Sequence, residues 1–317
     1  MKRSIVAALT LVFLLAARPA RAADPVFHFV DGDGYRELLY GDTPIYRYVS
    51  KYDPADRENT FKPFHHLYGM HGEGFITKGP GGLYTHHRGM FFGFKTQYGD
   101  FWHCKDVTQQ HQKYLPDREH VDAKSATCAA VVDWVDKDGK AVVRETREVT
   151  VTRPSDDQEI LDWTFTLESL RGEIDLGGDP QHAGFHFRAD NEVSGADQKA
   201  GKTGTATYLR QEGAKFTKND EWLDTNWVAC SFKVKDNPYV VVHMDHPDNP
   251  RPITYSTRSY GRFGSFMPMK VTEGKPLKLK YRIVLLEGKT HANPQVADIE
   301  KMYQAYVSQT KTASASE

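Results

Sequence analysis

Histidine is concentrated in one stretch of this sequence. Seven of the fourteen histidines lie between Phe64 and His111, among several glycines and aromatic residues. A buried imidazole must find hydrogen-bond partners, so histidine is a poor core filler, and its ordinary pKa lies near neutrality. Glycine lets the backbone approach a ligand closely, and aromatic faces suit the flat apolar faces of a sugar ring. The composition predicts that this stretch forms one wall of an active site.

The motif His86-His87-Arg88 opens an apolar, aromatic strand within that stretch. In an extended segment His86 and Arg88 share one face and His87 takes the other. An imidazole exchanges protons, and a guanidinium holds a carboxylate or a pair of hydroxyls. We therefore predict that these three residues are catalytic and that Trp102 and His103, further along, bind the substrate. The alternative is a hydrogen-bonded strand end that stabilises a turn.

A second motif places His182 and His186 four residues apart. On a helix that spacing is typical of a zinc pair, but the surrounding glycines and a proline disfavour a helix. In a strand, His182, His186 and Arg188 share one face, and Gly184 leaves room between the imidazoles for a ligand or an ion. We predict that His186 and Arg188 are catalytic and that His182 and His186 are the ligands of any bound metal. The alternative is the solvated outer face of an ordinary strand.

A third motif, Asp245-His246, follows a buried strand and enters a proline-stiffened loop. Strand-end loops on a rigid scaffold often carry binding residues. Arg258 and Tyr260 follow shortly after. We predict that Asp245, His246, Arg258 and Tyr260 bind the substrate. The alternative is a turn, because Asp, Asn and Pro are turn formers.

Two mechanisms remain open for such a site. Histidine with carboxylate suits a divalent metal such as zinc or manganese, which would act as a Lewis acid. No spacing matches a dedicated metal motif, however, and Arg88 and Arg188 would repel a cation placed between them. Without a metal, the arginines would stabilise an enolate while His86 serves as the acid–base group.

Most of the chain has the pattern of β-strands. Two hairpins are predicted around turns at 31–34 and 136–139, and alternating apolar and polar residues mark several later strands. Only Asn293 to Ser308 has helical periodicity, with Asn293 as its cap and Pro294 in its first turn. We predict an all-β fold, a large antiparallel β-sandwich with a C-terminal helix. This single domain covers residues 23–309, and a disordered tail follows at 310–317.

Residues 1–22 have the pattern of a secretory signal peptide, with two basic residues, an apolar run and Ala20-Arg21-Ala22. Cleavage leaves 37 Lys and Arg against 42 Asp and Glu, a net charge of −5. That balance provides no basic surface for nucleic acid or anionic lipid. We predict a periplasmic or extracellular protein without membrane insertion, and its oligomeric state stays open. Two of the three cysteines could pair in an oxidising compartment, or all three are buried small side chains.

The three motifs together resemble one bacterial family, the "methane oxygenase PmoA-like" domain. The matching segments are the doubled histidine with Arg88, Asp100-Phe101-Trp102, the Arg144-Glu145-Thr146-Arg147 run, Gly184 to Arg188, and Asp245 to Arg251. The family often has His-Pro before the doubled histidine, where this chain has Tyr84-Thr85. The resemblance implies a β-supersandwich like that of galactose mutarotase, and members are associated with proteins that degrade glycosides. It does not imply an oxygenase, because the membrane methane monooxygenase subunit is built from spanning helices.

We therefore predict an exported carbohydrate-active enzyme with a carbohydrate substrate. A lyase or eliminase that cleaves a glycoside of an oxidised, 3-keto or uronic sugar fits best, because histidine can remove a carbon-bound proton beside a carbonyl. A noncatalytic sugar-binding protein is the alternative from another class. A glycoside hydrolase or a sugar epimerase or mutarotase is a further alternative, although no pair of carboxylates stands out beside the histidines.

Overall fold

We analysed a computed structural model of the chain. The structure describes residues 25–195 and 204–314, and for residues 310–314 the backbone alone. The predicted signal peptide at residues 1–22 lies outside the described residues. In the described part of the chain, no helix combines the length and apolar character needed to cross a membrane.

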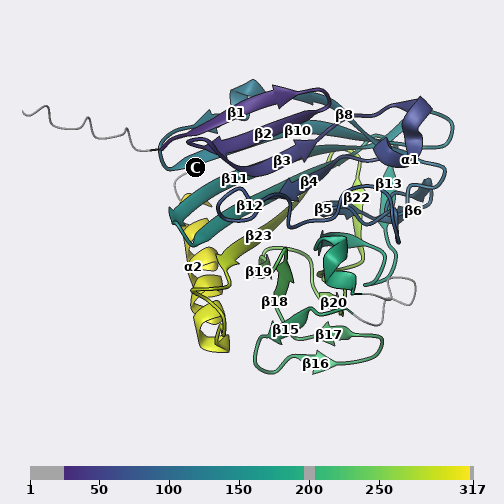
Figure 1. Cartoon of the computed structure of the whole chain (residues 1–317). Coiled ribbons are helices and arrows are strands. Elements are labelled where there is room, and N and C mark those ends of the chain that lie inside the picture. The colour runs from purple at the N-terminus through teal and green to yellow at the C-terminus, as the bar shows by residue number, and fades with distance from the viewer. Residues whose placement is uncertain (1–24, 196–203, 315–317) are drawn as a thin grey trace, which may run out of the picture.

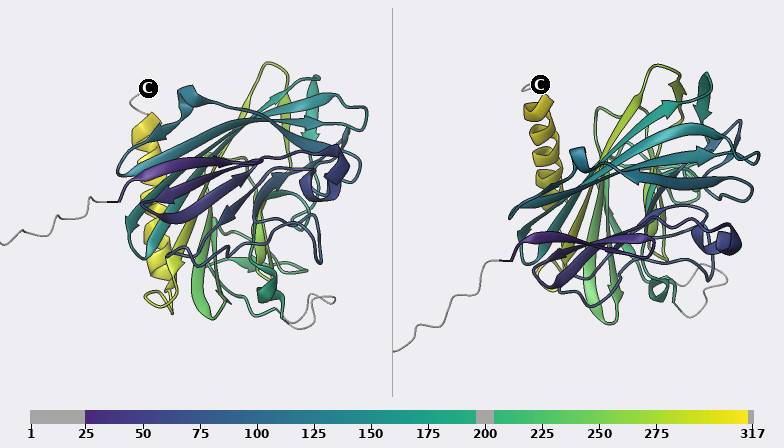
Figure 2. Two further views of the ribbon diagram at one scale, coloured as in Figure 1. Left: turned by 45° about the horizontal axis from the view of Figure 1, so that its top comes forward. Right: turned by 90° about the horizontal axis from the view of Figure 1, so that it is seen from above.

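Two large antiparallel sheets form the protein, and Figure 2 shows them as separate layers. The ten-stranded sheet has the order β1-β2-β3-β4-β5-β14-β21-β20-β17-β16. Its strands are β1 (Phe27–Gly32), β2 (Tyr35–Tyr40), β3 (Thr43–Val49), β4 (Phe64–Leu67), β5 (Met90–Gly93), β14 (Gly184–Arg188), β16 (Lys215–Phe216), β17 (Glu221–Leu223), β20 (Thr254–Arg258) and β21 (Arg262–Phe266).

The nine-stranded sheet has the order β15-β18-β19-β23-β12-β11-β10-β8, with β9 paired to β10. Its strands are β8 (Thr108–Tyr114), β9 (His120–Val121), β10 (Ser125–Val135), β11 (Ala141–Ser155), β12 (Gln158–Ser169), β15 (Thr207–Arg210), β18 (Trp227–Val234), β19 (Asn237–Asp245) and β23 (Leu277–Glu287). Two small ribbons are β6 (Lys95–Thr96) with β7 (Gly99–Asp100) and β13 (Glu173–Leu176) with β22 (Met269–Thr272). The helices are α1 (Arg57–Thr60) and α2 (Val296–Ser314), with 3-10 turns at Pro54–Asp56, Pro116–Arg118 and Asn191–Ser194.

This architecture confirms the predicted all-β antiparallel sandwich with a C-terminal helix. Both predicted hairpins are present, as β1 with β2 and β10 with β11. The alternation in the sequence matches the burial: in β12, Leu161, Trp163, Phe165 and Leu167 point into the core between the sheets. Side chains on alternate positions of a strand face opposite sides of its sheet, which is why this pattern is readable from sequence.

The helix α2 packs against the outer face of the nine-stranded sheet. Its Ile299, Tyr303 and Tyr306 join a cluster with side chains of β18, β19 and β23. Figures 1 and 2 place α2 on the opposite side of the molecule from α1. The helix begins at Val296 rather than at the predicted Asn293, because Gln295 supplies the first carbonyl of the helical hydrogen bonds, and it continues to Ser314.

A buried polar chain connects the two sheets. Arg147 of β11 donates to Glu145 Oε1 at 2.6 Å and to His65 Nε2 of β4 at 3.0 Å. Trp134 donates to the other oxygen of Glu145 at 3.0 Å, and His65 is also hydrogen-bonded to Tyr46. Buried charges need such partners, since an unpaired one is costly in the interior. The network therefore fixes β4, and with it the loop that leads to β5.

Candidate functional site

Four adjacent strands of the ten-stranded sheet, β5, β14, β21 and β20, carry a pocket near their ends. The pocket has a volume of about 250 Å³. We call it the histidine pocket, and it is lined by Tyr84, His86, His87, Gln181, His182, Arg258, Tyr260 and Arg262. Its size is just below the ~300–1,000 Å³ of pockets that take drug-sized ligands, so it has room for about one sugar-sized group.

The loop that carries His86 and His87 is held by a buried lysine. Lys78 Nζ donates to the carbonyl oxygens of Gly79, Gly81 and His87, at 2.9, 2.6 and 3.0 Å. Gly89 has φ +46°, and a Cβ there would lie 2.1 Å from the carbonyl oxygen of His65, so only glycine fits. The chain therefore turns into β5 instead of extending through the doubled histidine.

This turn corrects the expectation that His86 and Arg88 share one face of a strand. The strand begins only at Met90. Arg88 is fully buried and donates to the carbonyl oxygens of Thr85, Asn59 and Glu58, the last two in α1. Its guanidinium also lies 3.8 Å from the centre of the Phe61 ring. Arg88 thus holds α1 against the loop and is absent from the pocket lining.

A row of four imidazoles includes His86, His87 and His182 of the pocket lining and His103 beside it. Ring centres are 4.3 Å apart for His86 and His87, 4.5 Å for His86 and His103, and 5.2 Å for His103 and His182. These residues come from three different loops: 68–89, 101–107 and 177–183. The structure therefore brings together four of the predicted site residues that are far apart in sequence.

Two of these histidines are each paired with an aspartate three residues earlier. His103 Nδ1 lies 2.7 Å from Asp100 Oδ2, and His182 Nδ1 lies 2.9 Å from Asp179 Oδ1. Lys95 Nζ lies 4.0 Å from Asp100 and 3.9 Å from Asp179, so one cation borders both pairs. A carboxylate on Nδ1 fixes the tautomer and leaves Nε2 as the proton acceptor. Both imidazoles are therefore oriented so that Nε2 can exchange a proton.

The protonation of the cluster follows from burial. Burial lowers the pKa of His86 to about 2, and the Lys62 ammonium is the largest charge that adds to this effect. Burial also lowers the pKa of His182, although the Asp179 carboxylate opposes it. At Asp100 burial favours the neutral acid, but hydrogen bonds from His103 outweigh it and bring the pKa to about 2. At neutral pH, His86 and His182 are thus neutral, and Asp100 is charged.

Aromatic rings form the floor under this row. Trp102 and His186 pack edge to face with centres 4.5 Å apart, and Phe91 lies 4.5 Å from Trp102. Trp102 and His186 are fully buried and are absent from the pocket lining, so Trp102 does not provide the stacking surface that we expected. The neighbouring pair Tyr84 and Tyr260, stacked at 5.4 Å, lines the pocket instead.

Three buried ring nitrogens in and under the pocket have no hydrogen-bond partner among the described residues. They are His87 Nδ1, Trp102 Nε1 and His186 Nε2. A buried polar atom without a partner costs free energy, so a bound polar group that reached one of them would be favoured.

The arginines near the pocket have different roles. Arg188 donates to the carbonyls of Ala189 and Tyr260 and to Ser194 Oγ at 2.9 Å, so it holds Tyr260 in place from below. Arg262 lines the pocket and donates to Gln181 and, at 3.2 Å, to His186 Nδ1. Arg258, at the end of β20, lines the pocket and donates to Asn219 and Asp220.

Asp245 and His246 lie outside the pocket lining. Asp245 accepts hydrogen bonds from Ser265 at 2.9 Å and from Arg251 at 3.1 Å. His246 packs edge to face on Tyr306 of α2, at 5.1 Å. The third sequence motif therefore connects β19 and its following loop to the helix side of the molecule.

Several lining or neighbouring residues were absent from the prediction. Gln181 and Tyr84 line the pocket, and Lys62 lies beneath it, where it donates to the carbonyl oxygen of Trp102. Its ammonium lies 4.5 Å from the Phe91 ring centre, and burial lowers the pKa of Lys62 to about 7. The repeated Asp-x-x-His spacing in the sequence could have indicated Asp100 and Asp179. Nothing in the sequence around Lys62 indicates that this lysine is buried.

The prediction of a metal at His182 and His186 stays untested. Among the described residues, no group of three or more His, Cys, Asp or Glu is placed to hold an ion. Arg262 also directs a guanidinium N–H at His186 Nδ1, and His182 Nδ1 is occupied by Asp179. A cation beside a guanidinium is unfavourable, so these donors do not fit a metal centre. The three cysteines are free and buried.

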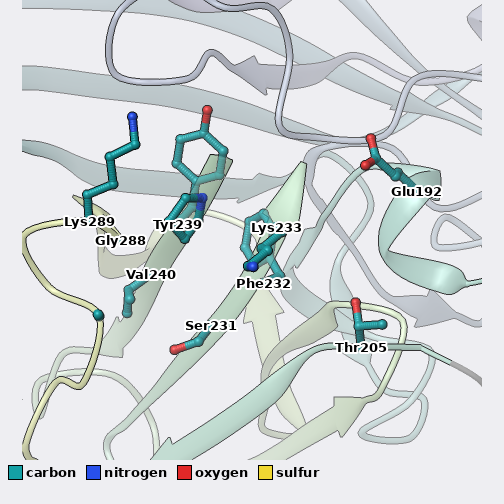
Figure 3. A pocket seen from close by; sticks show the side chains of 11 residues that line it. Glu192, Thr205, Ser231, Phe232, Lys233, Tyr239, Val240, Gly288 and Lys289 are labelled. Carbon is teal, nitrogen blue, oxygen red and sulfur yellow. The ribbon is translucent and has the colours of Figure 1, made fainter. Parts of the chain in front are cut away.

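A larger cavity, of about 710 Å³, borders β18 and β19 (Figure 3). Tyr239 and Lys289 stand on one side of it and Glu192 on the other, as Figure 3 shows. Its lining includes none of the clustered histidines. Size alone does not assign a site, and the histidines whose pKa values burial lowers, His86, His87 and His182, line the histidine pocket instead.

Fold and site define an antiparallel β-sandwich protein with a histidine- and arginine-lined pocket at the ends of four adjacent strands. Residues 36–300 match the family described as "Family of unknown function (DUF6807)", and the chain belongs to this family. This match overturns the predicted membership of the PmoA-like family. No curated protein matches the chain.

Some solved structures resemble this one distantly. Heparan sulfate lyase HepC from Pedobacter heparinus is 8% identical, with 84% of this chain and 37% of that chain covered and a TM-score of 0.40; a mutant of it gives 0.43. A heparinase III is 7% identical, with 87% and 37% covered and a TM-score of 0.35. The chain thus spans about a third of the length of these proteins. Similarity at this level does not establish a shared activity.

Proposed function

We propose that the protein is an exported carbohydrate-active lyase that acts on an acidic or keto sugar. The observation that carries the proposal is the pair of Asp–His couples, Asp100 with His103 and Asp179 with His182, set 5.2 Å apart by their imidazoles. Two oriented imidazoles beside arginines, one to take a proton and one to give a proton, suit elimination next to a carbonyl or carboxylate. Export rests on the signal-peptide pattern of residues 1–22.

The charge of the histidine pocket supports an anionic ligand. Its described lining contains Arg258 and Arg262 and no Asp or Glu, and the carboxylate of Asp220, which lies outside the lining, accepts from Arg258 at 3.4 Å. A guanidinium can hold a carboxylate through two parallel hydrogen bonds. The same guanidinium stabilises the negative charge of the enolate that forms when the carbon beside that carboxylate loses its proton. The stacked Tyr84 and Tyr260 offer an aromatic surface to the apolar face of the ring.

The reaction assigns a role to each couple. His182, which lines the pocket, takes the proton from the carbon beside the carboxylate. The electron pair of the broken carbon–hydrogen bond passes into an enolate that the arginines hold. As the enolate collapses to a carbon–carbon double bond, the neighbouring carbon–oxygen bond breaks. The leaving oxygen takes a proton from Nε2 of His103, which enters this step protonated with its Nδ1 hydrogen-bonded to the Asp100 carboxylate.

Other chemistries fit the pocket less well. A glycoside hydrolase needs two carboxyl groups that face the bond with water between them, and here Asp100 and Asp179 are each bonded to a histidine. A sugar epimerase would share the proton removal without the elimination. A noncatalytic sugar-binding protein would use the stacked tyrosines and the arginines but would gain nothing from two Asp–His couples.

The test is a screen of acidic and keto glycosides for ultraviolet absorbance of a new conjugated double bond, with wild type compared to His182→Gln. The variant should lose roughly 10²–10⁴-fold in kcat while it still binds the sugar, as expected when a general base is removed. The matched control is His120→Gln, because His120 pairs with Asp122 at 2.9 Å on an exposed strand and is not part of the pocket lining. Binding of the sugars without turnover by wild type would favour the sugar-binding alternative.

A further inference from the structure

A second cavity lies on the other side of His86. Its volume is also about 250 Å³. We call it the α1 pocket, because α1 contributes to its wall, and it is lined by Arg57, Glu58, Phe61, Thr85, His86, His103, Cys104 and Lys105. His86 is the residue that it shares with the histidine pocket.

We infer that the two pockets are adjoining sugar subsites, and that the bond between the two sugars lies over His86 and His103. The inference rests on the proposed function and extends it to the substrate. His182 lines the histidine pocket, His103 lines the α1 pocket, and His86 borders both. The imidazole row therefore runs from one cavity into the other, and a linkage between two bound sugars would pass over it.

The two pockets differ in charge. The histidine pocket has two arginines and, in its described lining, no acid, whereas the α1 pocket combines Arg57 and Lys105 with the carboxylate of Glu58. Mixed charges with the Thr85 hydroxyl offer donors and acceptors to the hydroxyls of an uncharged sugar. The substrate class is therefore an acidic sugar, held in the histidine pocket, linked to a neutral sugar in the α1 pocket.

The walls of the α1 pocket are tied together by hydrogen bonds. Arg57 donates to the carbonyl oxygens of Cys104 and Val107, at 2.6 and 2.8 Å. Arg88 connects α1 to Thr85 from below, through the carbonyls described above. When a pocket has its shape before the ligand binds, less free energy is spent on ordering its walls during binding. This preformed shape favours a ligand-binding role over an incidental gap between loops.

The test measures binding by calorimetry, so it does not depend on turnover. The ligands are a free hexuronic acid and a disaccharide of that acid linked to a neutral hexose, both titrated into His182→Gln so that neither is consumed. The disaccharide should bind at least about tenfold more tightly than the free acid, because it fills both pockets. Equal affinities would overturn the inference.

Two substitutions then locate the second sugar. Thr85→Tyr, in the same background, fills the α1 pocket and should weaken disaccharide binding by about tenfold while the affinity for the free acid stays within about twofold. Lys105→Glu should act in the same direction and serves if the tyrosine variant does not fold; His120→Gln is the control for both. Unchanged disaccharide affinity in a folded variant would overturn the inference.

The two proposals fail in different ways. Tight disaccharide binding that depends on Thr85, without turnover by wild type, would sustain the subsites and refute the lyase. Turnover of a simple acidic glycoside with no gain from the second sugar would sustain the lyase and refute the subsites.

Discussion

The protein should lose stability steeply below pH 6, because its interior holds more neutral histidines than neutral acids. Burial lowers the pKa of five almost fully buried histidines: His65, His66, His87, His186 and His243. For His66 and His243 the value falls to about 3. Below pH 6.5 these rings stay neutral in the folded chain, and His66 and His243 do so until the pH nears about 3, while the unfolded chain binds their protons. The contribution of these histidines to stability is therefore full above pH 6.5 and is lost as the pH falls.

Two buried acids oppose this trend. Burial raises the pKa of Glu159 to about 8 and that of Asp245 to about 7. The folded chain keeps these protons where the unfolded chain releases them, so both acids favour folding as the pH falls. Each group changes stability by about 1.4 kcal/mol per pH unit. Five histidines against two acids leave a net loss on the order of 4 kcal/mol per pH unit, against a total stability of about 5–15 kcal/mol for a typical protein.

The assay is urea unfolding followed by tryptophan fluorescence at pH 7.5, 6.5, 5.5 and 4.5. The free energy of unfolding should be level between the first two and fall from then on. His243→Gln, which removes a ring hydrogen-bonded to Tyr255 at 3.0 Å, should reduce the slope by about 1.4 kcal/mol per pH unit, whereas His120→Gln, at an exposed site, should leave it unchanged. A free energy of unfolding that holds or rises from pH 6.5 to 4.5 would refute the reasoning.

Three further predictions concern the site and its support. Asp179→Asn and Asp100→Asn should each lower kcat by roughly 10²–10⁴-fold with little change in the melting temperature, because the amide no longer fixes the base tautomer; full activity in steady-state assays of both would remove the couples from the mechanism. Glu145→Ala should destabilise the fold by about 3–5 kcal/mol in urea unfolding, since it leaves Arg147 buried and unpaired, while Glu148→Ala, on the same strand but in a partly exposed pair at 3.6 Å, should cost under about 1 kcal/mol. Dialysis against a chelator should leave activity unchanged, because Arg262 faces His186; stoichiometric metal by elemental analysis, lost together with activity, would contradict this.

The sandwich was predictable because strand alternation is local. In β14, Phe185 and Phe187 enter the core between the sheets and His186 packs on the opposite face, as the period of two requires. The loop before β5 was not predictable in this way. Its path depends on Lys78, which gathers three carbonyl groups, and a lysine in the sequence does not indicate that it will be buried.

The same dependence on contacts that the sequence does not show explains why two arginines are not placed as predicted. The sequence predicted catalytic roles for Arg88 and Arg188 because each was expected to share a strand face with a histidine two residues earlier, His86 and His186. An arginine has five N–H donors, however, and what it does depends on what accepts them. Carbonyl oxygens from three residues surround Arg88, and carbonyl and hydroxyl oxygens surround Arg188, so both are held as internal supports.

The arginines that line the pocket come from a strand end and the next strand start, at Arg258 and Arg262. Arg188 lies on β14, the strand next to β21, and donates to the carbonyl oxygen of Tyr260, which lies between the two lining arginines in the chain. Replacing Arg188 should therefore disturb the pocket through Tyr260, whereas replacing Arg258 should remove a charge from it. The two effects separate by ionic strength: binding of an acidic sugar should become less salt-dependent in Arg258→Gln and keep its salt dependence in Arg188→Gln, because only the first change removes a cation that lines the pocket. Equal loss of salt dependence in both folded variants would mean that Arg188 also acts on the ligand directly by its charge.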